Sequence, residues 1–339
     1  MLHHALLYDV LKDNRVQCNL CAHRCIIKDQ KQGICHVREN RDGKLYTLVY
    51  GNLISRNIDP IEKKPLYHFL PGTKAYSIAT PGCNFHCEWC QNWQISQMPR
   101  LMQMPKSKRV LPEEIVESAL ISGCRSIAYT YTEPTIFFEY SYDVAQLANE
   151  AGLKNVYVTN GFMTPEMLEM FHPYLDAANV DIKAFHDETY RKLMGGRLAP
   201  VLDSCRKMKS LGIWLEITTL IVPGVNDDPE ELKAIATFIY EDLGAEVPWH
   251  LSRFYPQYKM IKQAPTEESI LHETKAMGKS IGLKYIYIGN VSGSNNTYCS
   301  DCGELLIARS GYFTRIVGLD DQGKCLNCGH KLDGFLISA

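Results

Sequence analysis

The sequence predicts an α/β protein built on one large parallel sheet, with a small cysteine-rich extension at each end. Between residues 75 and 289, short β-rich runs alternate with amphipathic helical stretches, a pattern typical of parallel strands joined by crossover helices. Eleven of the thirteen cysteines fall into three spaced sets, and two of these sets lie outside the alternating region. We therefore expect an N-terminal extension (residues 1–72), a core domain (73–291) and a C-terminal extension (292–339).

Each expected element of the core follows from its local pattern. β-branched and aromatic runs predict strands at residues 75–80, 126–131, 155–160, 179–183, 214–221, 249–254 and 285–289. Helical periodicity predicts helices at residues 112–122, 135–150, 164–171, 187–194, 201–211, 229–240 and 267–281. The carboxyl ends of parallel strands meet at one edge, so we expect the motifs that follow the first four strands to share one site.

Composition excludes several classes of protein. The chain has 339 residues and a formal net charge of −2, with no long run of one sign, so nothing indicates binding to nucleic acid or to a membrane surface. No stretch of 18 apolar residues predicts a membrane span, and residues 1–14 lack the features of a signal peptide. We expect a cytoplasmic protein, in which clustered cysteines bind metal rather than form disulfides.

The central cysteine set, Cys83-x3-Cys87-x2-Cys90, provides three thiolates from one short loop after the first strand. A [4Fe–4S] cluster that is fully coordinated by protein takes four cysteines, so three would leave one iron open to an exchangeable ligand. A small zinc site completed by His86 is the alternative.

Residues 83–90 (CNFHCEWC) resemble the signature of the radical S-adenosylmethionine (radical SAM) superfamily. The resemblance implies a [4Fe–4S] cluster on Cys83, Cys87 and Cys90 that reductively cleaves S-adenosylmethionine to a 5′-deoxyadenosyl radical, which abstracts hydrogen. It also implies a partial (β/α)6 barrel that is open on one side. Residues 131–134 (YTEP) stand where the family has Gly-Gly-Glu-Pro, so Tyr131 and Thr132 replace two glycines.

Further segments resemble the pyruvate formate-lyase activating enzyme group: 158–161 (VTNG), 181–183 (DIK), 222–224 (VPG) and 250–254 (HLSRF). Those enzymes usually have Asp where this chain has Val158. The resemblance implies an S-adenosylmethionine site formed by Trp89, Thr132, Glu133, Thr159, Asn160, Asp181, Lys183 and His250. Lys183 suits the carboxylate of this cofactor.

The two outer cysteine sets predict further metal sites. The C-terminal set, Cys299, Cys302, Cys325 and Cys328, forms two Cys-x2-Cys-Gly pairs that predict a zinc ribbon, with an auxiliary iron–sulfur cluster as the alternative. The N-terminal set, Cys18, Cys21, Cys25 and Cys35, fits zinc or an iron–sulfur cluster equally well, and His23 and His36 offer nitrogen ligands. Cys124 and Cys205 stand alone, and we expect them in the core.

Nearly the whole chain resembles the radical SAM protein of the AmmeMemoRadiSam system. The resemblance rests on the N-terminal cysteines, residues 59–69 (DPIEKKPLYHF), residues 90–93 (CQNW) and the C-terminal cysteine pairs. It implies Memo-like and AMMECR-type proteins as partners, besides an external electron donor of the flavodoxin or ferredoxin type. The substrate, a small molecule or a protein, is not identified. Residues that could face it are Gln91, Asn92, Trp93, Glu133, Arg253 and Tyr255.

Two other functions compete with this one. The first is an activase that places a glycyl radical on a large enzyme. The second is a non-catalytic metal-binding or nucleic-acid-binding protein built on zinc ribbons, against which the balanced charge counts.

Overall fold

The structure is a computed structural model that describes residues 2–102 and 108–334. Met1 and residues 335–339, at the ends of the two expected extensions, lie outside the described residues. No helix within the described residues is long and apolar enough to cross a membrane.

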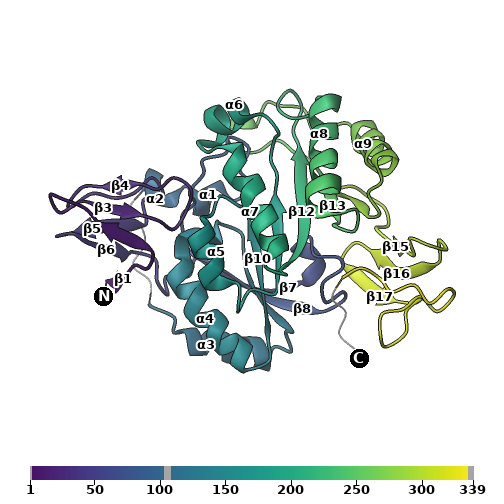
Figure 1. The fold of residues 1–339 in the computed structure, drawn as a ribbon, viewed down its shortest axis with the longest axis horizontal. Coiled ribbons are helices and arrows are strands. Elements are labelled where there is room, and N and C mark those ends of the chain that lie inside the picture. Colours follow the sequence, from purple (N-terminus) through teal and green to yellow (C-terminus); the bar gives the residue numbers. More distant parts are fainter. Residues whose placement is uncertain (1, 103–107, 335–339) are drawn as a thin grey trace.

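An eight-stranded sheet forms the centre of the molecule (Figure 1), in the order β14-β13-β12-β11-β10-β9-β8-β7. Seven strands are parallel and match the predicted runs closely: β8 (Lys74–Ala79), β9 (Ser126–Tyr129), β10 (Lys154–Thr159), β11 (Ala177–Asp181), β12 (Trp214–Ile221), β13 (Trp249–Arg253) and β14 (Ile286–Gly289). An eighth strand that was not predicted, β7 (Ser55–Pro60), pairs antiparallel with β8 at the edge. In the described part of the chain β14 does not pair with β7, so the predicted partial barrel is confirmed.

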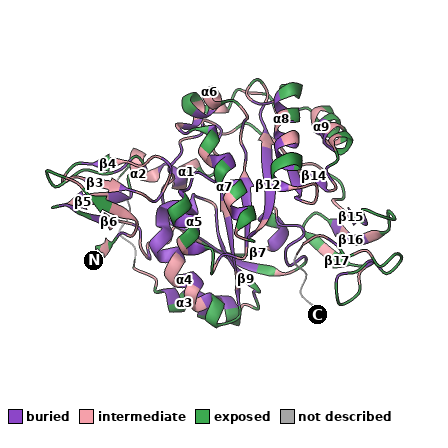
Figure 2. Cartoon of the chain, in the orientation of Figure 1, coloured by how far each residue is buried: buried purple, intermediate pink, exposed green. Residues whose placement is uncertain are grey.

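Helices join the parallel strands in order and cover the outside of the sheet (Figure 1). The main ones are α3 (Pro112–Ile121), α4 (Phe138–Glu150), α5 (Pro165–Phe171), α7 (Leu198–Ser210), α8 (Pro229–Phe238) and α9 (Glu268–Ile281). Their starts follow from the sequence: the Asp228 carboxylate accepts hydrogen bonds from the backbone N–H groups of Glu230 and Glu231, and Pro229 occupies the first turn of α8. Figure 2 shows that the strands of the central sheet are mostly buried while the outer helix faces are exposed.

Several short elements differ from the predictions. The single helix predicted at 187–194 is a short α6 (Asp187–Thr189) followed by a π-helical turn, η3 (Tyr190–Met194). The helix predicted at 135–150 begins with a 3-10 turn, η2 (Pro134–Phe137), and α8 continues into the π-helical turn η4 (Ile239–Leu243). Four short helices of the described residues were not predicted, namely η1 (Ile61–Lys63), α1 (Trp93–Ser96), α2 (Met98–Leu101) and η5 (Tyr258–Met260), and neither were the short strands of the two extensions. A helix of three or four residues is too short to show the hydrophobic periodicity by which longer helices are predicted.

Residues 61–70 pack against the first four parallel strands. Ile61, Leu66, Phe69 and Leu70 form a separate apolar cluster with one residue from each of these strands, namely Ala75, Ala128, Val156 and Ala177. Three of the four strand residues are alanine, which leaves room for the larger side chains. The segment therefore closes the floor of the partial barrel and places residues 62–67 beneath its mouth.

The N-terminal extension forms two small sheets beside α4. One contains β1 (His3–His4), β6 (Lys44–Thr47) and β5 (Arg38–Arg41), and the other contains β2 (Tyr8–Val10), β3 (Val16–Cys18) and β4 (Ile26–Ile27). A buried ion pair attaches the extension to α4: Arg38 Nη1 lies 2.8 Å from Glu139 Oε1. Glu139 Oε1 also accepts a hydrogen bond from the Leu6 backbone, at 2.7 Å.

The C-terminal extension folds against the other side of the barrel (Figure 1). Its sheet contains β15 (Thr297–Tyr298), β16 (Leu305–Ser310) and β17 (Phe313–Ile316). The buried Arg309 guanidinium donates hydrogen bonds to Tyr67 O at 2.6 Å and to Thr297 Oγ1 at 2.6 Å. The β16–β17 turn, Gly311 and Tyr312, lines the central cavity, so this extension supplies part of its wall.

Candidate active site

A cavity of about 890 Å³ lies where the carboxyl ends of the parallel strands meet. Every residue that the sequence assigned to the cluster or to the S-adenosylmethionine site lines it, namely Cys83, Cys87, Trp89, Cys90, Thr132, Glu133, Thr159, Asn160, Asp181, Lys183 and His250. These residues come from five strands and from the loops that follow them. The expectation of one shared site therefore matches the geometry.

The three central cysteines occupy the loop that follows β8. Burial raises the pKa of the Cys83 thiol well above its ordinary value, and the nearby charges of Glu133 and Cys87 raise it further. Burial likewise raises the pKa of Cys87 to about 12, although Lys183 acts to lower it. Thiols in such a place need a bound cation before they ionise. Among the described residues that line the cavity, these are the only cysteines, so the donor set fits a cluster with one open iron.

Hydrogen-bond donors surround the sulfur atoms. The Phe85 backbone N–H donates to Cys83 Sγ at 3.3 Å, and Asn160 Nδ2 lies 3.9 Å from the same sulfur. Ser96 Oγ lies 3.3 Å from Cys90 Sγ. Donors of this kind set the reduction potential of an iron–sulfur cluster. The sequence analysis missed Ser96, because the one-turn helix α1 that places it next to the loop gave no signal.

The carboxylate of Glu133 connects the ends of β9 and β10. It is 2% exposed and accepts hydrogen bonds from Thr135, Thr159 Oγ1 (2.7 Å) and the Asn160 backbone N–H (2.8 Å). Burial raises its pKa above the ordinary value, and these donors act to lower it. Glu133 therefore fixes the position of Thr159 and Asn160 besides facing the cavity.

Tyr131 has a backbone conformation that glycine favours. Its φ is 62°, in the left-handed region that side chains other than glycine rarely occupy. Such a residue costs about 1–3 kcal/mol and often marks a functional site. Its backbone carbonyl accepts a hydrogen bond from Asn92 Nδ2 at 2.9 Å, and Thr132 Oγ1 donates to Thr80 O at 2.8 Å. These hydrogen bonds hold the backbone of Tyr131 and Thr132 beside the cavity.

Charged groups on β11 and β13 complete the wall. Lys183 Nζ lies 2.7 Å from Asp181 Oδ2. Burial acts to lower the pKa of Lys183, but the charges of Asp181 and Cys87 outweigh it and raise this pKa. His250 Nε2 lies 2.7 Å from a carboxylate oxygen of Glu216, a fully buried residue that sequence reasoning missed because it stands inside a strand rather than at its end.

The residues proposed to face the substrate are only partly brought together. Gln91, Asn92, Arg253 and Tyr255 line the cavity, as does Glu133. Trp93 is not among the lining residues. Its ring stacks on that of Tyr258 with centroids 5.0 Å apart, because α1 turns the side chain toward η5.

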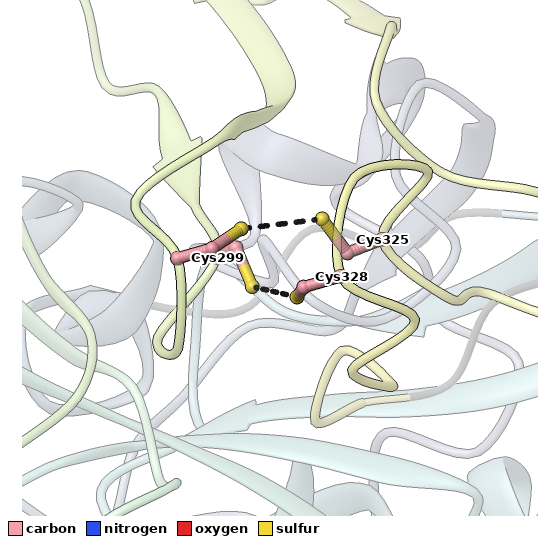
Figure 3. A group of neighbouring side chains, drawn as sticks. Cys299, Cys325 and Cys328 are labelled. Carbon is pink, nitrogen blue, oxygen red and sulfur yellow. Dashed lines mark hydrogen bonds between the residues drawn. The ribbon is translucent and has the colours of Figure 1, made fainter.

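The four C-terminal cysteines form a compact group, shown in part in Figure 3. Their sulfur atoms all lie within 4.8 Å of one another, and the pairs Cys299–Cys328 and Cys302–Cys325 are each 3.6 Å apart. Four sulfurs at about 2.3 Å from one tetrahedral ion would be about 3.8 Å apart. The group therefore has the dimensions of a site for one metal ion.

The four N-terminal cysteines lie beside the central cysteine loop. Burial raises the pKa of Cys21, and the charges of Cys18 and Cys35 raise it further. His23 Nε2 lies 2.9 Å from Asn84 O in the central loop. Within residues 2–102 and 108–334, these four cysteines do not form a compact group of three or more ligand atoms, either among themselves or with His23 or His36.

The two single cysteines belong to the core, as predicted. Cys124 is 4% exposed and Cys205 is fully buried, and both pack in the main apolar cluster.

Comparison with known proteins identifies the class to which this site belongs. Residues 77–238 match the radical SAM superfamily. An uncharacterized protein of Methanocaldococcus jannaschii is 46% identical over 332 residues, which cover 97% of this chain and 98% of that protein. A radical SAM methyltransferase from Sphaerobacter thermophilus has the same fold, with a TM-score of 0.51 and 16% identity over 70% of this chain and 71% of the other.

The chain therefore belongs to the radical SAM superfamily, and it is an enzyme. Membership implies a [4Fe–4S] cluster and S-adenosylmethionine as cofactors. Among more distant relatives is the pyruvate formate-lyase-activating enzyme of Clostridium pasteurianum, 23% identical over 50% of this chain and 72% of that protein. Another is a putative glycyl-radical enzyme activating enzyme of Methanocaldococcus jannaschii, 24% identical over 64% of this chain and 80% of that protein.

Proposed function

We propose that Cys83, Cys87 and Cys90 hold the [4Fe–4S] cluster, and that the cavity beside them binds S-adenosylmethionine and a substrate from which hydrogen is abstracted. The observation that carries this proposal is the convergence of eleven predicted residues, from five strands, on one cavity. When bound, the reduced cluster supplies the electron that cleaves S-adenosylmethionine. The protein supplies the position of that cofactor and the walls of the cavity that holds it.

Particular side chains suit the parts of S-adenosylmethionine. Lys183 would pair with its carboxylate while keeping its ion pair with Asp181, whose Oδ2 lies 2.7 Å from the Lys183 ammonium group. Trp89 is 3% exposed on the cavity wall and would pack near the adenine. Thr159 and Asn160 are held in place by Glu133, so the ends of β9 and β10 form a rigid part of the site.

The test is anaerobic reconstitution followed by iron and sulfide counts and an assay for 5′-deoxyadenosine after reduction. Replacing Cys83, Cys87 and Cys90 with alanine should remove about four irons per chain and abolish cleavage of S-adenosylmethionine. Cys124→Ala is the matched control, because this cysteine lies in the core away from the cavity and should leave both measurements unchanged. Cleavage that survives the triple substitution would refute the assignment.

For the C-terminal group, Cys299, Cys302, Cys325 and Cys328, we propose a bound zinc ion. The 3.6 Å distances between the cysteine sulfurs support one zinc ion. The four cysteines that hold a [4Fe–4S] cluster each bind a different iron, so their sulfur atoms are farther apart. Metal analysis of the triple alanine variant of the central loop should still find one zinc. Iron retained at this site instead would identify an auxiliary cluster.

The N-terminal set, Cys18, Cys21, Cys25 and Cys35, is proposed as a second outer metal site that takes zinc or an iron–sulfur cluster. Its burial next to the central loop supports a site that orders the N-terminal extension. Alanine at Cys18 and Cys21 should lower the total metal count, and the element lost decides between the two metals.

The resemblance to the AmmeMemoRadiSam protein supports a role in that system, in the cytoplasm, with Memo-like and AMMECR-type proteins as partners and a flavodoxin or ferredoxin as electron donor. The second candidate function is activation of a glycyl radical enzyme, which the named activating enzymes among the relatives favour. Adding candidate partners to the reduced enzyme distinguishes the two functions. A glycyl radical on a large partner, detected by electron paramagnetic resonance, would support activation.

A further inference from the structure

Lys64 lines the active-site cavity and is not one of the residues assigned above to the cluster or to S-adenosylmethionine. It follows η1 in the DPIEKKPLYHF segment, and its side chain is 1% exposed. Its backbone N–H donates to Ile61 O at 2.8 Å, so the apolar floor of the barrel fixes its place. A buried primary amine thus lies next to the space in which the substrate must bind.

Three groups surround the Lys64 ammonium group. Asp59 Oδ2 lies 2.6 Å from Nζ, and the ring of Tyr131 lies beneath it with its centroid 4.4 Å away. The Tyr131 hydroxyl donates a hydrogen bond to the same oxygen of Asp59. Lys63 Nζ lies 2.9 Å from the other oxygen, Asp59 Oδ1, and its side chain is 46% exposed. The cluster therefore holds one carboxylate, one phenol and two amines, of which one is buried and the other open to the cavity.

The strained backbone of Tyr131 serves this cluster. A φ of 62° is energetically less favourable for tyrosine than for glycine. The tyrosine side chain, however, makes contacts with Lys64 and Asp59 that glycine could not make. Burial lowers the pKa of Lys64 to about 8, although Asp59 acts to raise it. At pH 7 about a tenth of such a lysine is neutral, which is roughly a hundredfold more than for a solvated lysine. Neutral lysine amines are nucleophiles toward carbonyl groups.

We propose that Lys64 forms an imine with an aldehyde or ketone group of the substrate, and that Lys63 binds a carboxylate on the same molecule. The substrate class is therefore an oxo acid. The carbonyl carbon forms a bond to Nζ, and the carbonyl oxygen leaves as water together with the two protons that the neutral amine loses. Solvent water in the cavity carries these protons from Nζ to the departing oxygen, so the step needs no oxidant or reductant. Burial acts to raise the pKa of Asp59, but the hydrogen bonds from Lys63, Lys64 and Tyr131 outweigh it and lower this pKa, so Asp59 stays ionised.

The proposal rests on the proposed function only for the location of the substrate, because imine formation needs neither the cluster nor S-adenosylmethionine. The test can therefore be made on the reconstituted full-length protein without S-adenosylmethionine, and failure to cleave that cofactor would not affect its result. Pyruvate serves as the oxo-acid probe and acetone as the ketone without a carboxylate. Sodium cyanoborohydride supplies the hydride that converts the imine into a stable secondary amine.

Peptide mapping by mass spectrometry then gives the rate at which each lysine is modified. With pyruvate at pH 7, Lys64 should be modified at least about tenfold faster than the exposed Lys233, because more of its amine is neutral. Lys64→Arg keeps the positive charge beside Asp59 and should lose the fast modification. The matched control Lys192→Arg, at a side chain that is 70% exposed, should keep it. Lys63→Met should remove the preference for pyruvate over acetone when both rates are normalised to that of Lys233.

The peptide map of the wild-type protein tests the proposed imine even if a variant fails to fold. Modification of Lys64 no faster than that of Lys233 would overturn the proposal, and Lys64 would then be a structural partner of Asp59. Fast modification by both probes to the same extent would overturn the role of Lys63 in binding a carboxylate.

Discussion

Glu216 and His250 face each other across the neighbouring strands β12 and β13, with His250 Nε2 2.7 Å from Glu216 Oε2 and both side chains almost completely buried. The same carboxylate accepts hydrogen bonds from the backbone N–H groups of Tyr67 and His68, at 2.8–3.0 Å. Trp214 Nε1 donates a further bond at 3.1 Å. One side chain thus connects the sheet, the floor segment and the cavity wall.

Glu216→Gln should destabilise the protein by about 2–4 kcal/mol, because an amide cannot accept all of these hydrogen bonds and leaves buried donors unpaired. The free energy of unfolding, measured with urea, checks this value. Glu230→Gln is the control: its side chain is 81% exposed, and the change should stay within about 0.5 kcal/mol. Equal effects of the two substitutions would contradict the central role of Glu216.

The same carboxylate predicts a pH dependence. Burial acts to raise the pKa of Glu216, but His250 and the other donors outweigh it, so the folded-state pKa is lower than the ordinary value. The stability from this group is therefore complete above the unfolded-state pKa of about 4.3 and is lost as the pH falls through the folded-state pKa. Unfolding measured at several pH values below 5 should show a smaller loss for Glu216→Gln than for the wild type. A loss of equal size would refute this contribution.

Ser96→Ala should lower the reduction potential of the cluster. Ser96 Oγ accepts a hydrogen bond from Gln97 Nε2 at 3.2 Å, so its own hydrogen is free to point to Cys90 Sγ, 3.3 Å away. Removing a donor from a cluster sulfur leaves more negative charge on it, and we expect a decrease on the order of tens of mV. A redox titration followed by electron paramagnetic resonance measures the potential. The exposed Ser280→Ala should not shift it.

Arg38 and Glu139 should stabilise the protein only when both are present. Their side chains are 2% and 1% exposed, so removal of one partner leaves a buried charge unpaired. Arg38→Met should cost about 3–5 kcal/mol and should make the N-terminal extension sensitive to protease. The half-exposed pair Arg24 and Glu166 is the comparison, where Arg24→Met should cost at most about 1 kcal/mol. If both substitutions cost the same, burial does not decide the strength of the first pair.

The left-handed backbone of Tyr131 can be tested by comparing two substitutions. Tyr131→Ala and Tyr131→Gly both remove the ring that contacts Lys64, but only glycine relieves the strain at φ 62°. The glycine variant should therefore be more stable than the alanine variant by about 1 kcal/mol. Urea unfolding of the two variants gives this difference directly, and an alanine variant of equal stability would show that the strain is small.

The sequence alone predicted the class of fold and most of the site. Alternating strands and helices predicted the parallel sheet, because periodicity and strand length are local properties of the chain. The carboxyl-end rule then brought residues as far apart as Cys83 and Lys183 to one cavity, since every parallel strand ends at the same edge. His250 was predicted from the family resemblance alone. Closely spaced cysteines predicted the compact C-terminal group for a similar reason, because two short turns place four sulfurs together.

Other features depended on contacts between distant segments. Two segments of the expected N-terminal extension belong to the barrel, namely β7 and the floor segment of residues 61–70. The floor segment also brings Lys64 to the Tyr131 ring. No local sequence pattern indicates what these segments pack against. Glu216 and Ser96 acquire their partners only when strands and a one-turn helix come together. The sequence thus predicted the reactive groups of the site, while tertiary packing decided which side chains are buried beside the cavity. Burial and partnership change the chemistry of a lysine or a carboxylate, and both arise only between segments that folding brings into contact.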